Sequence, residues 1–354
     1  MSNDSDNNKA VFFGFSFLHH GPHTAFHGLA KALSDQIVID VTPPLPRQTP
    51  HWIMWRFNWR WLAWSERRVR PYFKDPEPRV IHYFFPENTM RQAAQWKGKH
   101  HLVATCHQPA ARLSGRERPV NPIFIESLKA SDAIIVQCKS HIGEYQALFP
   151  DVKVGCIPLG VDTTFFHGRV EIPQERPRIL TVGNWLRDYA TWAKVVNTFA
   201  WKASAPEFTV VASANTIAEA KRHLSNDNLP VRFLCGISDE ELRAEYEKAT
   251  LFYLPLEDAM ANDAILEALA MGKASVVTDL PATRDYLGDA AIYVAKNSAD
   301  EAIAAIEGLL THPDRARSMR MCARQRAEDL YAWDKIADQY RQVYRQVAEG
   351  TFQP

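Results

Sequence analysis

Two side chains stand where strand-like segments end, and both could act on a bound ligand. Arg187 follows the apolar segment RILTVGN at 178–184, and its guanidinium can bind two phosphate oxygens at once. His107 ends the segment HLVATCH at 101–107, where a histidine can hydrogen-bond a hydroxyl group or stabilise charge. The simpler alternatives are a solvated arginine and a histidine bonded to local backbone. Ligands bind at the carboxyl ends of parallel strands, so both residues are candidates for a site.

Glu267 is the candidate carboxylate, in the segment LEALAMG near the start of a predicted helix. A carboxylate can accept two hydrogen bonds from a cis-diol. The residues before it, Asn262 to Ile265, would offer backbone N–H groups to a phosphate at the helix N-terminus. Asp263 is expected to cap this helix and face away. The alternative for Glu267 is an ordinary acidic residue that the helix dipole favours.

Four histidines crowd the first loop and helix, at positions His19, His20, His23 and His27. His23 and His27 are four residues apart and could share a helix face. No acidic or thiol ligand accompanies them, so we expect a ligand-lining or loop role and no metal. The only DxD string is Asp4-Ser5-Asp6, in a polar leading segment, and no GxGxxG is present. Both observations argue against metal-dependent transfer and against dinucleotide oxidation.

The elements that must position these residues alternate between strands and helices. The first half opens strand–helix–strand over 10–41, and three more apolar runs and a last strand follow at 79–85, 101–107, 132–138 and 153–162. After a polar, proline-containing spacer, the second half has strand-like runs at 178–184, 208–214, 231–236, 251–256, 274–279 and 291–295. A helix is predicted over 189–203, and a long helix over 334–348 ends the chain.

This alternation predicts an α/β protein with two Rossmann-like, doubly wound domains facing across a cleft. We place the first domain at 1–168 and the second at 169–332, with the C-terminal helix in 333–354. Clefts between domains commonly bind nucleotides and small ligands. The architecture alone does not separate an enzyme from a binding protein.

Composition restricts the class further. The 354 residues are 46% hydrophobic and 23% charged, with 41 acidic and 41 basic side chains, which is typical of a globular protein and argues against a nucleic-acid partner. Five separated cysteines without a CxxC pair indicate reduced thiols and a cytoplasmic location. No segment approaches the roughly 20 apolar residues of a membrane helix, so any membrane contact is expected to be peripheral.

Four strings resemble the retaining glycosyltransferases of the GT-B fold, family four (group 1). They are IPLGVDTTFF at 157–166, LTVGNW at 180–185, FLCGISDEELRAEYEKATLFYLPL at 233–256 and NDAILEALAMGKASVVTDLPATRDYL at 262–287. They occur in the family's order and at about its spacing. The first half matches through its opening strand–loop–helix and VATCHQP at 103–109. The resemblance implies a hexosyl-type glycosyltransferase whose C-terminal helix crosses back to the first domain.

The resemblance places a nucleotide-sugar donor on the second domain. Glu267 would hold the ribose hydroxyls, and the donor-binding set comprises Gly183, Asn184, Arg187, Gly236, Asn262, Ala264, Ile265 and Glu267. Gly236 lies in the neighbourhood of the base, where Ser238 and Glu241 also form an S-x-x-E capping box. No cofactor or metal is implied, because cations and helix N–H groups would carry the leaving diphosphate.

Two departures from the family pattern bear on activity. The glutamate expected eight residues before Glu267 is replaced by Ala259, and Asn184 stands where an arginine is usual. Glu257 and Asp258 lie beside the gap and are candidates for donor-sugar contacts. Two alternatives therefore stay open: a non-catalytic scaffold that keeps the fold, and a sugar-nucleotide epimerase of the same fold.

The resemblance places the acceptor, a glycan or a lipid-linked glycan, on the first domain. His107 is the catalytic candidate beside the transferred sugar, and Gly21, His20 and His23 are candidates for the acceptor side. In retaining enzymes of this kind the departing phosphate oxygen deprotonates the acceptor, so no side-chain nucleophile is needed. Family habit also points to polysaccharide biosynthesis.

The segment 52–70 holds five tryptophans interleaved with arginines, among them Arg56, Arg60 and Arg67. Tryptophan favours membrane interfaces and arginine favours anionic head groups. One interpretation is a peripheral contact with the inner face of the cytoplasmic membrane near a lipid-linked acceptor. Stacking on a soluble glycan and simple packing of an aromatic helix are the alternatives.

Overall fold

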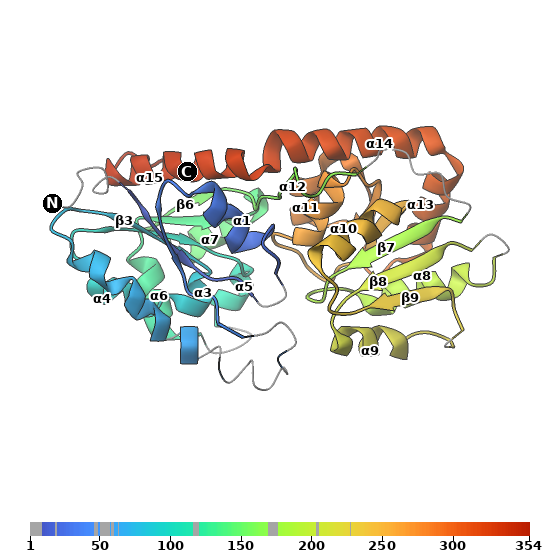
Figure 1. Cartoon of the computed structure of the whole chain (residues 1–354), viewed down its shortest axis with the longest axis horizontal. Coiled ribbons are helices and arrows are strands. Elements are labelled where there is room, and N and C mark those ends of the chain that lie inside the picture. Colours follow the sequence, from blue (N-terminus) through green and yellow to red (C-terminus); the bar gives the residue numbers. More distant parts are fainter. Residues whose placement is uncertain are drawn as a thin grey trace. The chain divides into compact units, whose positions relative to one another are not determined.

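The chain was analysed as a computed structural model, which describes residues 9–17, 20–45, 49, 57, 60–62, 64–115, 120–168, 176–202, 205–226 and 228–354. It divides into two compact units (Figure 1). Unit 1 comprises Met1–Gly160 and Trp333–Pro354, and unit 2 comprises Val161–Ala332.

Unit 1 is built on a parallel six-stranded sheet in the order β2-β1-β3-β4-β5-β6. Its strands are β1 (Val11–Gly14), β2 (Ile37–Asp40), β3 (Val80–Phe84), β4 (His101–Thr105), β5 (Ala133–Val136) and β6 (Lys153–Cys156). Its helices are α1 (Ala25–Ala32), α3 (Pro86–Thr89), α4 (Ala93–Trp96), α5 (Ala110–Leu113), α6 (Pro122–Lys129), α7 (Ile142–Leu148) and α15 (Trp333–Ala348), with short 3₁₀ turns at Glu66–Arg68, Arg70–Lys74 and Lys139–His141.

Unit 2 has a second parallel six-stranded sheet, in the order β12-β11-β10-β7-β8-β9. Its strands are β7 (Arg178–Val182), β8 (Glu207–Val211), β9 (Val231–Leu234), β10 (Leu251–Leu254), β11 (Ser275–Thr278) and β12 (Ala291–Val294). Its helices are α8 (Tyr189–Phe199), α9 (Ala214–Arg222), α10 (Asp239–Lys248), α11 (Asp263–Ala270), α12 (Pro281–Leu287), α13 (Ala299–Thr311) and α14 (Pro313–Arg326), with a 3₁₀ turn at Gly288–Ala290 and a π-helical turn at Ala327–Tyr331.

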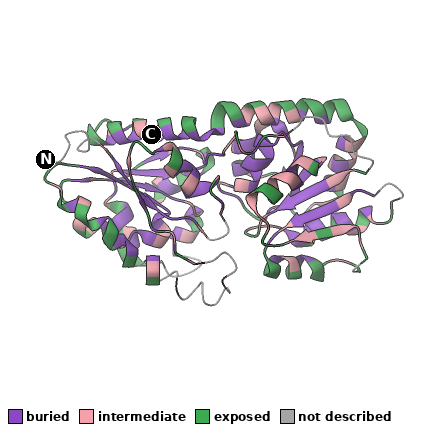
Figure 2. Ribbon diagram, viewed as in Figure 1, coloured by how far each residue is buried: buried purple, intermediate pink, exposed green. Residues whose placement is uncertain are grey.

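The strands form where the sequence has short apolar runs, as expected for parallel sheets covered on both faces. In unit 1, β1, β3 and β5 are buried along their whole length, and Figure 2 shows buried strands in both sheets. In unit 2, the core centres on Trp192 of α8, which is fully buried with residues of β8, β10 and α13. Each predicted strand is confirmed. Each ends a residue or more before its predicted end, and β8 begins one residue earlier than predicted, at Glu207.

Helix α15 is held to unit 1 by a buried polar cluster. The two ring nitrogens of His82 lie 2.7 Å from the Tyr344 hydroxyl and 2.7 Å from the Thr105 hydroxyl. Thr105 also lies 3.1 Å from the Tyr340 hydroxyl. Because α15 supplies both tyrosines while His82 and Thr105 belong to β3 and β4, these bonds fix the helix on the sheet.

The first unit ends at Gly160 instead of at residue 168, where the sequence boundary was placed. Arg324 of α14 explains the difference, because its guanidinium donates to the carbonyl oxygens of Thr163 and Phe166. Val161 also pairs with Ala332 in an isolated bridge. The segment after Gly160 is thus tied to unit 2.

The helix predicted over 189–203 ends at Phe199, and Trp201 beyond it is 82% exposed, so no core contact extends the helix.

Candidate functional site

Unit 2 places its candidate residues where the strand order reverses, between β7 and β10. In an open α/β sheet, such a switch point is where ligands bind. The loop after β7 pairs with the chain after β10: Arg187 forms an antiparallel bridge with Leu256, and the Glu257 backbone N–H donates to the Leu186 carbonyl over 2.9 Å. The two loops therefore form one structured surface at the carboxyl edge of the sheet.

Gly183 allows Arg187 to fold back over this loop. Its φ is +111°, a region that favours glycine, and a Cβ at this position would overlap the Arg187 guanidinium. Leu186 also has a positive φ, of 59°, which is uncommon for a non-glycine residue. Both residues of this loop, Gly183 and Leu186, therefore have a positive φ. Together these two backbone angles place the Arg187 guanidinium against the end of β7.

The Arg187 guanidinium is bonded on all three nitrogens. Nε donates to the Val182 carbonyl over 3.0 Å, Nη1 to the Trp185 carbonyl over 2.7 Å, and Nη2 to Asn262 Oδ1 over 3.2 Å. Burial lowers the pKa of Arg187 from its ordinary value, and the nearby acidic and phenolic groups oppose this shift. The guanidinium has five N–H groups, so these bonds leave donors for a phosphate while fixing the fork.

Asn184 has a local structural role. Its Oδ1 accepts a hydrogen bond of 2.6 Å from the backbone N–H of Ser213, the residue that caps α9. The side chain thereby joins the loop after β7 to the loop after β8. Arg187, three residues later, is therefore the candidate for the cation that the family has at position 184.

Helix α11 carries Glu267 in its second turn, where the side chain is 4% exposed. The Tyr246 hydroxyl of α10 lies 2.9 Å from Glu267 Oε2 and 3.1 Å from the Ala264 carbonyl. The helix begins after Asn262, which is the N-cap residue without a side-chain capping bond. The expected cap by Asp263 is therefore wrong, since Asp263 is the first helical residue and Asn262 Oδ1 faces Arg187 instead.

The Glu267 carboxyl is held largely in its neutral form. Burial raises its pKa to about 8, the charge of Asp263 adds to the rise, and the hydrogen bond from Tyr246 and the charge of Arg187 oppose it. A buried carboxyl group with a raised pKa in a ligand-binding position is a recognised sign of a functional site. Arg187, Asn262 and Glu267 are thus brought together, with Ala264 and Ile265 in the intervening first turn of α11.

Gly236 lies after β9 with a φ of +67°, and α10 starts three residues later, at Asp239. The predicted capping box is confirmed: the Ser238 hydroxyl accepts from the Glu241 N–H, and the Glu241 carboxylate accepts from the Ser238 N–H over 2.7 Å. The cap fixes the loop at 236–238 and starts the helix that supplies Tyr246. Gly236 is at the next strand end beyond β8, farther along the sheet from Glu267.

The three residues at the gap in the family pattern differ in exposure. Glu257 and Asp258 are exposed, and Ala259 is 4% exposed. Asp258 Oδ1 accepts a hydrogen bond of 2.8 Å from the Ala259 N–H. The two carboxylates therefore lie at the surface beside the Arg187 bridge, while the position of the missing glutamate is a buried methyl group.

In unit 1, His107 lies at the carboxyl end of β4 among aromatic and amide side chains. Its ring centroid is 3.8 Å from that of Phe85 and 4.4 Å from that of Phe84. Its Nε2 lies 3.1 Å from Gln137 Nε2, at the end of β5. Burial lowers the pKa of His107 well below its ordinary value, so the ring is neutral at physiological pH. It can then donate or accept one hydrogen bond at each nitrogen.

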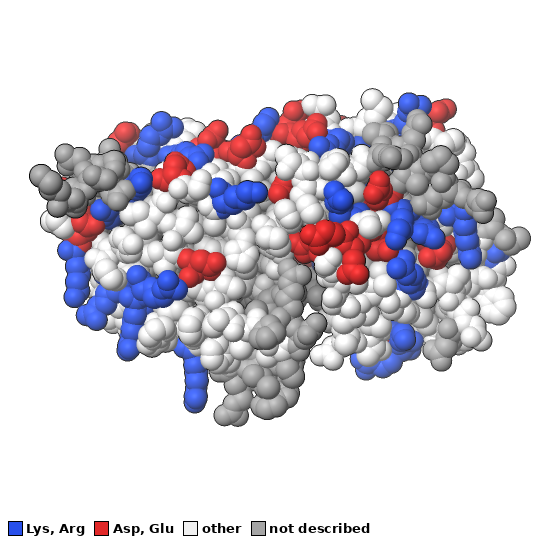
Figure 3. Space-filling view, viewed as in Figure 1, with Lys and Arg blue, Asp and Glu red and all other residues white. Residues whose placement is uncertain are grey.

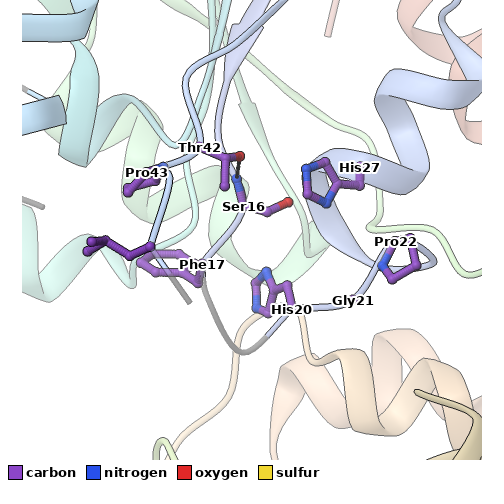
Figure 4. Close-up of a pocket in the computed structure, with 9 residues that line it drawn as sticks. Ser16, Phe17, His20, Gly21, Pro22, His27, Thr42 and Pro43 are labelled. Carbon is purple, nitrogen blue, oxygen red and sulfur yellow. Dashed lines mark hydrogen bonds between the residues drawn. The ribbon is translucent and has the colours of Figure 1, made fainter. Parts of the chain in front are cut away.

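A cavity of about 240 Å³ lies at the carboxyl ends of β1 and β2. Figure 4 shows Ser16, His20 and His27 facing this space, with Gly21, Phe17 and Thr42 around it. Ser16 is 1% exposed, and its hydroxyl oxygen is buried without a hydrogen-bond partner in the described part of the chain. The cavity offers hydroxyl and imidazole groups, which suit a hydroxylated ligand.

Two of the three acceptor candidates, His20 and Gly21, line this cavity, and His23 does not. Helix α1 begins at Ala25, so His23 precedes it and does not share a helix face with His27. The His23 carbonyl instead accepts a hydrogen bond from the Trp333 indole. His27 lies 3.3 Å from Asp40; burial raises the pKa of Asp40, but hydrogen bonds from His27 and Thr42 outweigh it and lower that pKa.

Part of the tryptophan segment lies outside the described residues, including Trp52, Trp55, Arg56 and Trp59. In its described part, Trp61 donates to the Val41 carbonyl and its ring packs against Phe57 and Trp64. Trp64 is 53% exposed. The membrane contact stays a prediction.

We also looked at the charge and metal-ligand patterns of the described residues. Figure 3 shows basic and acidic side chains interspersed over the visible face. Across the described ranges, no group of three or more His, Cys, Asp or Glu is arranged to hold a metal ion. Within the same ranges, none of the helices has the length and apolar character needed to span a bilayer.

Sequence reasoning did not find several residues of these sites. Tyr246 is the clearest case, since its role depends on α10 and α11 lying side by side. Ser16, Thr42 and Gln137 are likewise brought in by the meeting of separate strand ends. The sequence signal for three of them was their position: Ser16 and Thr42 follow predicted strands, and Gln137 is near the end of one.

Known proteins share this fold and these domains. The model of Glycosyltransferase Family 4 matches residues 18–165, and that of Glycosyl transferases group 1 matches residues 176–312. An alpha-maltose-1-phosphate synthase from Mycolicibacterium smegmatis is 24% identical over 271 residues, which are 68% of this chain and 69% of that protein.

Solved structures agree on the architecture. A sucrose-phosphate synthase from Thermosynechococcus elongatus has a TM-score of 0.73 at 16% identity, covering 97% of this chain and 100% of its own. Anabaena HepE, solved in complex with UDP and glucose, has a TM-score of 0.67 at 11% identity, covering 95% of this chain and 99% of its own.

Two parallel Rossmann-like units of this kind define the GT-B fold. The chain belongs to the GT-B glycosyltransferases, with a family-four domain followed by a group 1 domain. Its class of activity is glycosyl transfer from a nucleotide-sugar donor.

Proposed function

We propose that the protein transfers a hexosyl group from a nucleoside-diphosphate sugar bound by unit 2 to a hydroxyl group of a glycan or lipid-linked glycan bound by unit 1. Transfer proceeds with retention and without a metal ion. The observation that carries the proposal is the meeting of Arg187, Asn262 and Glu267 at the strand-order reversal of unit 2. These groups suit the phosphates and the ribose of one nucleotide.

In the proposed donor complex, the diphosphate lies at the N-terminus of α11. The backbone N–H groups of Ala264 and Ile265 and the fixed Arg187 fork neutralise it. Two ribose hydroxyls donating to Glu267 would favour its ionised form, which is the minor form without a ligand, and the base lies toward Gly236. Glu257 and Asp258, both exposed beside this surface, are candidates for the sugar hydroxyls.

In the proposed reaction, the bond between the anomeric carbon and the phosphate oxygen breaks, and a bond to the acceptor oxygen forms on the same face. The acceptor proton passes to the departing phosphate oxygen. Neutral His107 would hydrogen-bond the transferred sugar near the reacting carbon. The cavity lined by Ser16, His20 and Gly21 would hold the acceptor through its hydroxyl and imidazole groups.

A non-catalytic, nucleotide-binding scaffold is the second candidate. The buried methyl group of Ala259 favours it, because no carboxylate reaches the donor sugar from that position. A scaffold would bind the nucleotide through Glu267 but show neither transfer nor slow donor hydrolysis. A sugar-nucleotide epimerase would instead convert the donor without an acceptor, so product analysis separates the three.

The first experiment is a thermal-shift screen against UDP, GDP, ADP and CDP, each with and without magnesium. UDP leads the set because HepE was solved with it. A ligand that binds the folded state raises the melting temperature according to its concentration and affinity. We expect a shift with one base, the same with and without magnesium, and lost in Glu267→Ala. No shift with any nucleotide would count against the donor site, and a shift that needs magnesium would contradict metal independence.

A further inference from the structure

Glu87 is a buried carboxylate that joins the end of β3 to the end of β4. Its Oε1 accepts the backbone N–H of His107 over 2.5 Å and that of Gln108 over 3.0 Å. Its Oε2 is buried without a hydrogen-bond partner among the described residues. An ionised oxygen that accepts two backbone N–H groups makes strong, charge-assisted bonds.

The turn that carries Glu87 also carries the ring that packs on His107. Phe85 has a φ of +63°, an uncommon conformation for an aromatic residue, and Pro86 follows as the first residue of α3. The Phe85 ring lies 3.8 Å from the His107 ring, centroid to centroid, at an interplanar angle of 30°. One short turn therefore contacts both the backbone and the imidazole of His107.

Helix α7 and the end of β5 also contact His107 and Gln108. The Tyr145 hydroxyl of α7 donates to the Gln108 carbonyl over 2.6 Å, and Gln137 reaches His107 Nε2 from the end of β5. Among these contacts, Glu87 is the one that brings a negative charge to the backbone N–H groups of His107 and Gln108. A glutamine would have nearly the same shape, so what a carboxylate adds at this position is its ionisation.

We propose that Glu87 is a positioning residue for His107, and that its ionised form fixes the 107–108 backbone and the imidazole in the arrangement used for transfer. This inference rests on the proposed function, in which His107 lies beside the transferred sugar. Protonation of Glu87 would weaken both backbone bonds and loosen His107.

Among Glu87, Cys106, Tyr145 and His107, Glu87 is the group whose charge changes near neutral pH. Burial raises the pKa of Glu87 to about 7, although the backbone bonds oppose the rise. Burial and the Glu87 charge raise the pKa of Cys106 well above its ordinary value, and the same influences act on Tyr145. Both are therefore neutral across this range. Burial also keeps His107 neutral, so its ring does not titrate there.

The test is the pH dependence of the His107 ring signals in an NMR spectrum of selectively labelled histidine, assigned by their loss in His107→Gln. Since His107 is neutral throughout, a titration seen at its signals near pH 7 reports a neighbour. We expect that titration in the wild-type protein and its disappearance in Glu87→Gln. A response that survives in Glu87→Gln would come from another neighbour, such as His20, whose charge also acts on His107, and would overturn the proposal.

Glu66→Gln is the matched control. Glu66 is also a buried carboxylate that accepts two successive backbone N–H groups, those of Arg91 and Gln92, but it does not contact His107. Glu66→Gln should keep the His107 titration. An equal loss in both variants would show a general effect of removing a buried carboxylate and would overturn the assignment to Glu87.

Activity gives a second readout. Ionised Glu87 favours transfer, so kcat of the wild type should rise with pH through about 7, whereas kcat of Glu87→Gln should be flat across this range and lower by about ten- to a hundred-fold at pH 8. The KM for the donor should change much less than kcat, because the nucleotide part of the donor binds unit 2 in the proposed function. A wild-type pH profile in Glu87→Gln would overturn the proposal. If no transfer is found with any donor, the proposed function fails, while the NMR result still decides whether Glu87 controls His107.

Discussion

Glu267 is a carboxyl group 4% exposed to solvent that accepts a hydrogen bond from Tyr246. Its pKa of about 8 means that the folded protein keeps this proton over a pH range in which the unfolded chain has lost it. Stability therefore falls as pH rises from the ordinary carboxyl range toward 8, and the loss is complete above that. A buried carboxyl group that lowers stability in this way is expected at a position where ligand binding requires a carboxyl group.

Glu267→Gln separates these two effects. The amide cannot ionise, so the variant should lose less of its free energy of unfolding than the wild type between pH 6 and 9, as measured by denaturant melts at each pH. It should also lose the thermal shift with nucleotide, because an amide offers one acceptor oxygen to two ribose hydroxyls. A variant with the wild-type pH dependence of stability would show that Glu267 does not titrate in this range. Retained nucleotide binding would remove it from the ribose site.

The chemistry of single residues was predictable where a strand ends, and less so where partners come from elsewhere in the chain. Arg187 and His107 were identified from the family resemblance and from their positions at strand ends. Their surroundings were not, since Asn262 reaches Arg187 from 75 residues away and Glu87 reaches His107 from 20. The capping assigned to Asp263 was wrong because Asn262 takes the cap position, and only the backbone dihedral angles decide between neighbours.

At the scale of elements, the apolar runs predicted the strands because both faces of a parallel sheet are covered, so hydrophobic content alone marks them. The ends were less predictable. Helix α8 ends at Phe199 although the sequence pattern continues, because Trp201 finds no core to pack on. The unit boundary moved to Gly160 because Arg324, far along the chain, binds the carbonyl groups of the next segment.

Helix α10 connects the proposed base site to the ribose site, since its cap lies after Gly236 and its Tyr246 bonds Glu267. Ser238→Ala removes the capping oxygen and should lower the free energy of unfolding by about 1 kcal/mol. Loosening the first turn should also weaken nucleotide affinity, measured by calorimetry. Ser298→Ala, at the cap of α13, is the control, because Ser298 also accepts from a backbone N–H, that of Glu301. It should lower stability and leave affinity unchanged; an equal loss of affinity in both would contradict a local role for the cap.

At the scale of the whole molecule, the chain leaves unit 1 at Gly160 and returns to it at Trp333. Trp333 is the first residue of α15 and lies between two glycines, because a Cβ at Gly28 or at Gly160 would overlap its indole. Its Nε1 donates to the His23 carbonyl over 3.1 Å. Unit 1 is thus completed by a helix from the far end of the chain, and close packing at this tryptophan fixes where that helix begins.

Gly28→Ala should displace Trp333 and lower the free energy of unfolding by about 1–3 kcal/mol, the usual effect of overpacking a core. Gly143→Ala is the control: it lies in α7, where a Cβ meets no described atom within 4 Å, and should leave stability unchanged or raise it by about 0.5 kcal/mol. The proposed donor site lies in unit 2, so both variants should keep the thermal shift with nucleotide. Unchanged stability in Gly28→Ala would mean that Trp333 is not packed against α1. Loss of the nucleotide shift there would mean that the donor site depends on unit 1, and the assignment of donor binding to unit 2 alone would have to be abandoned.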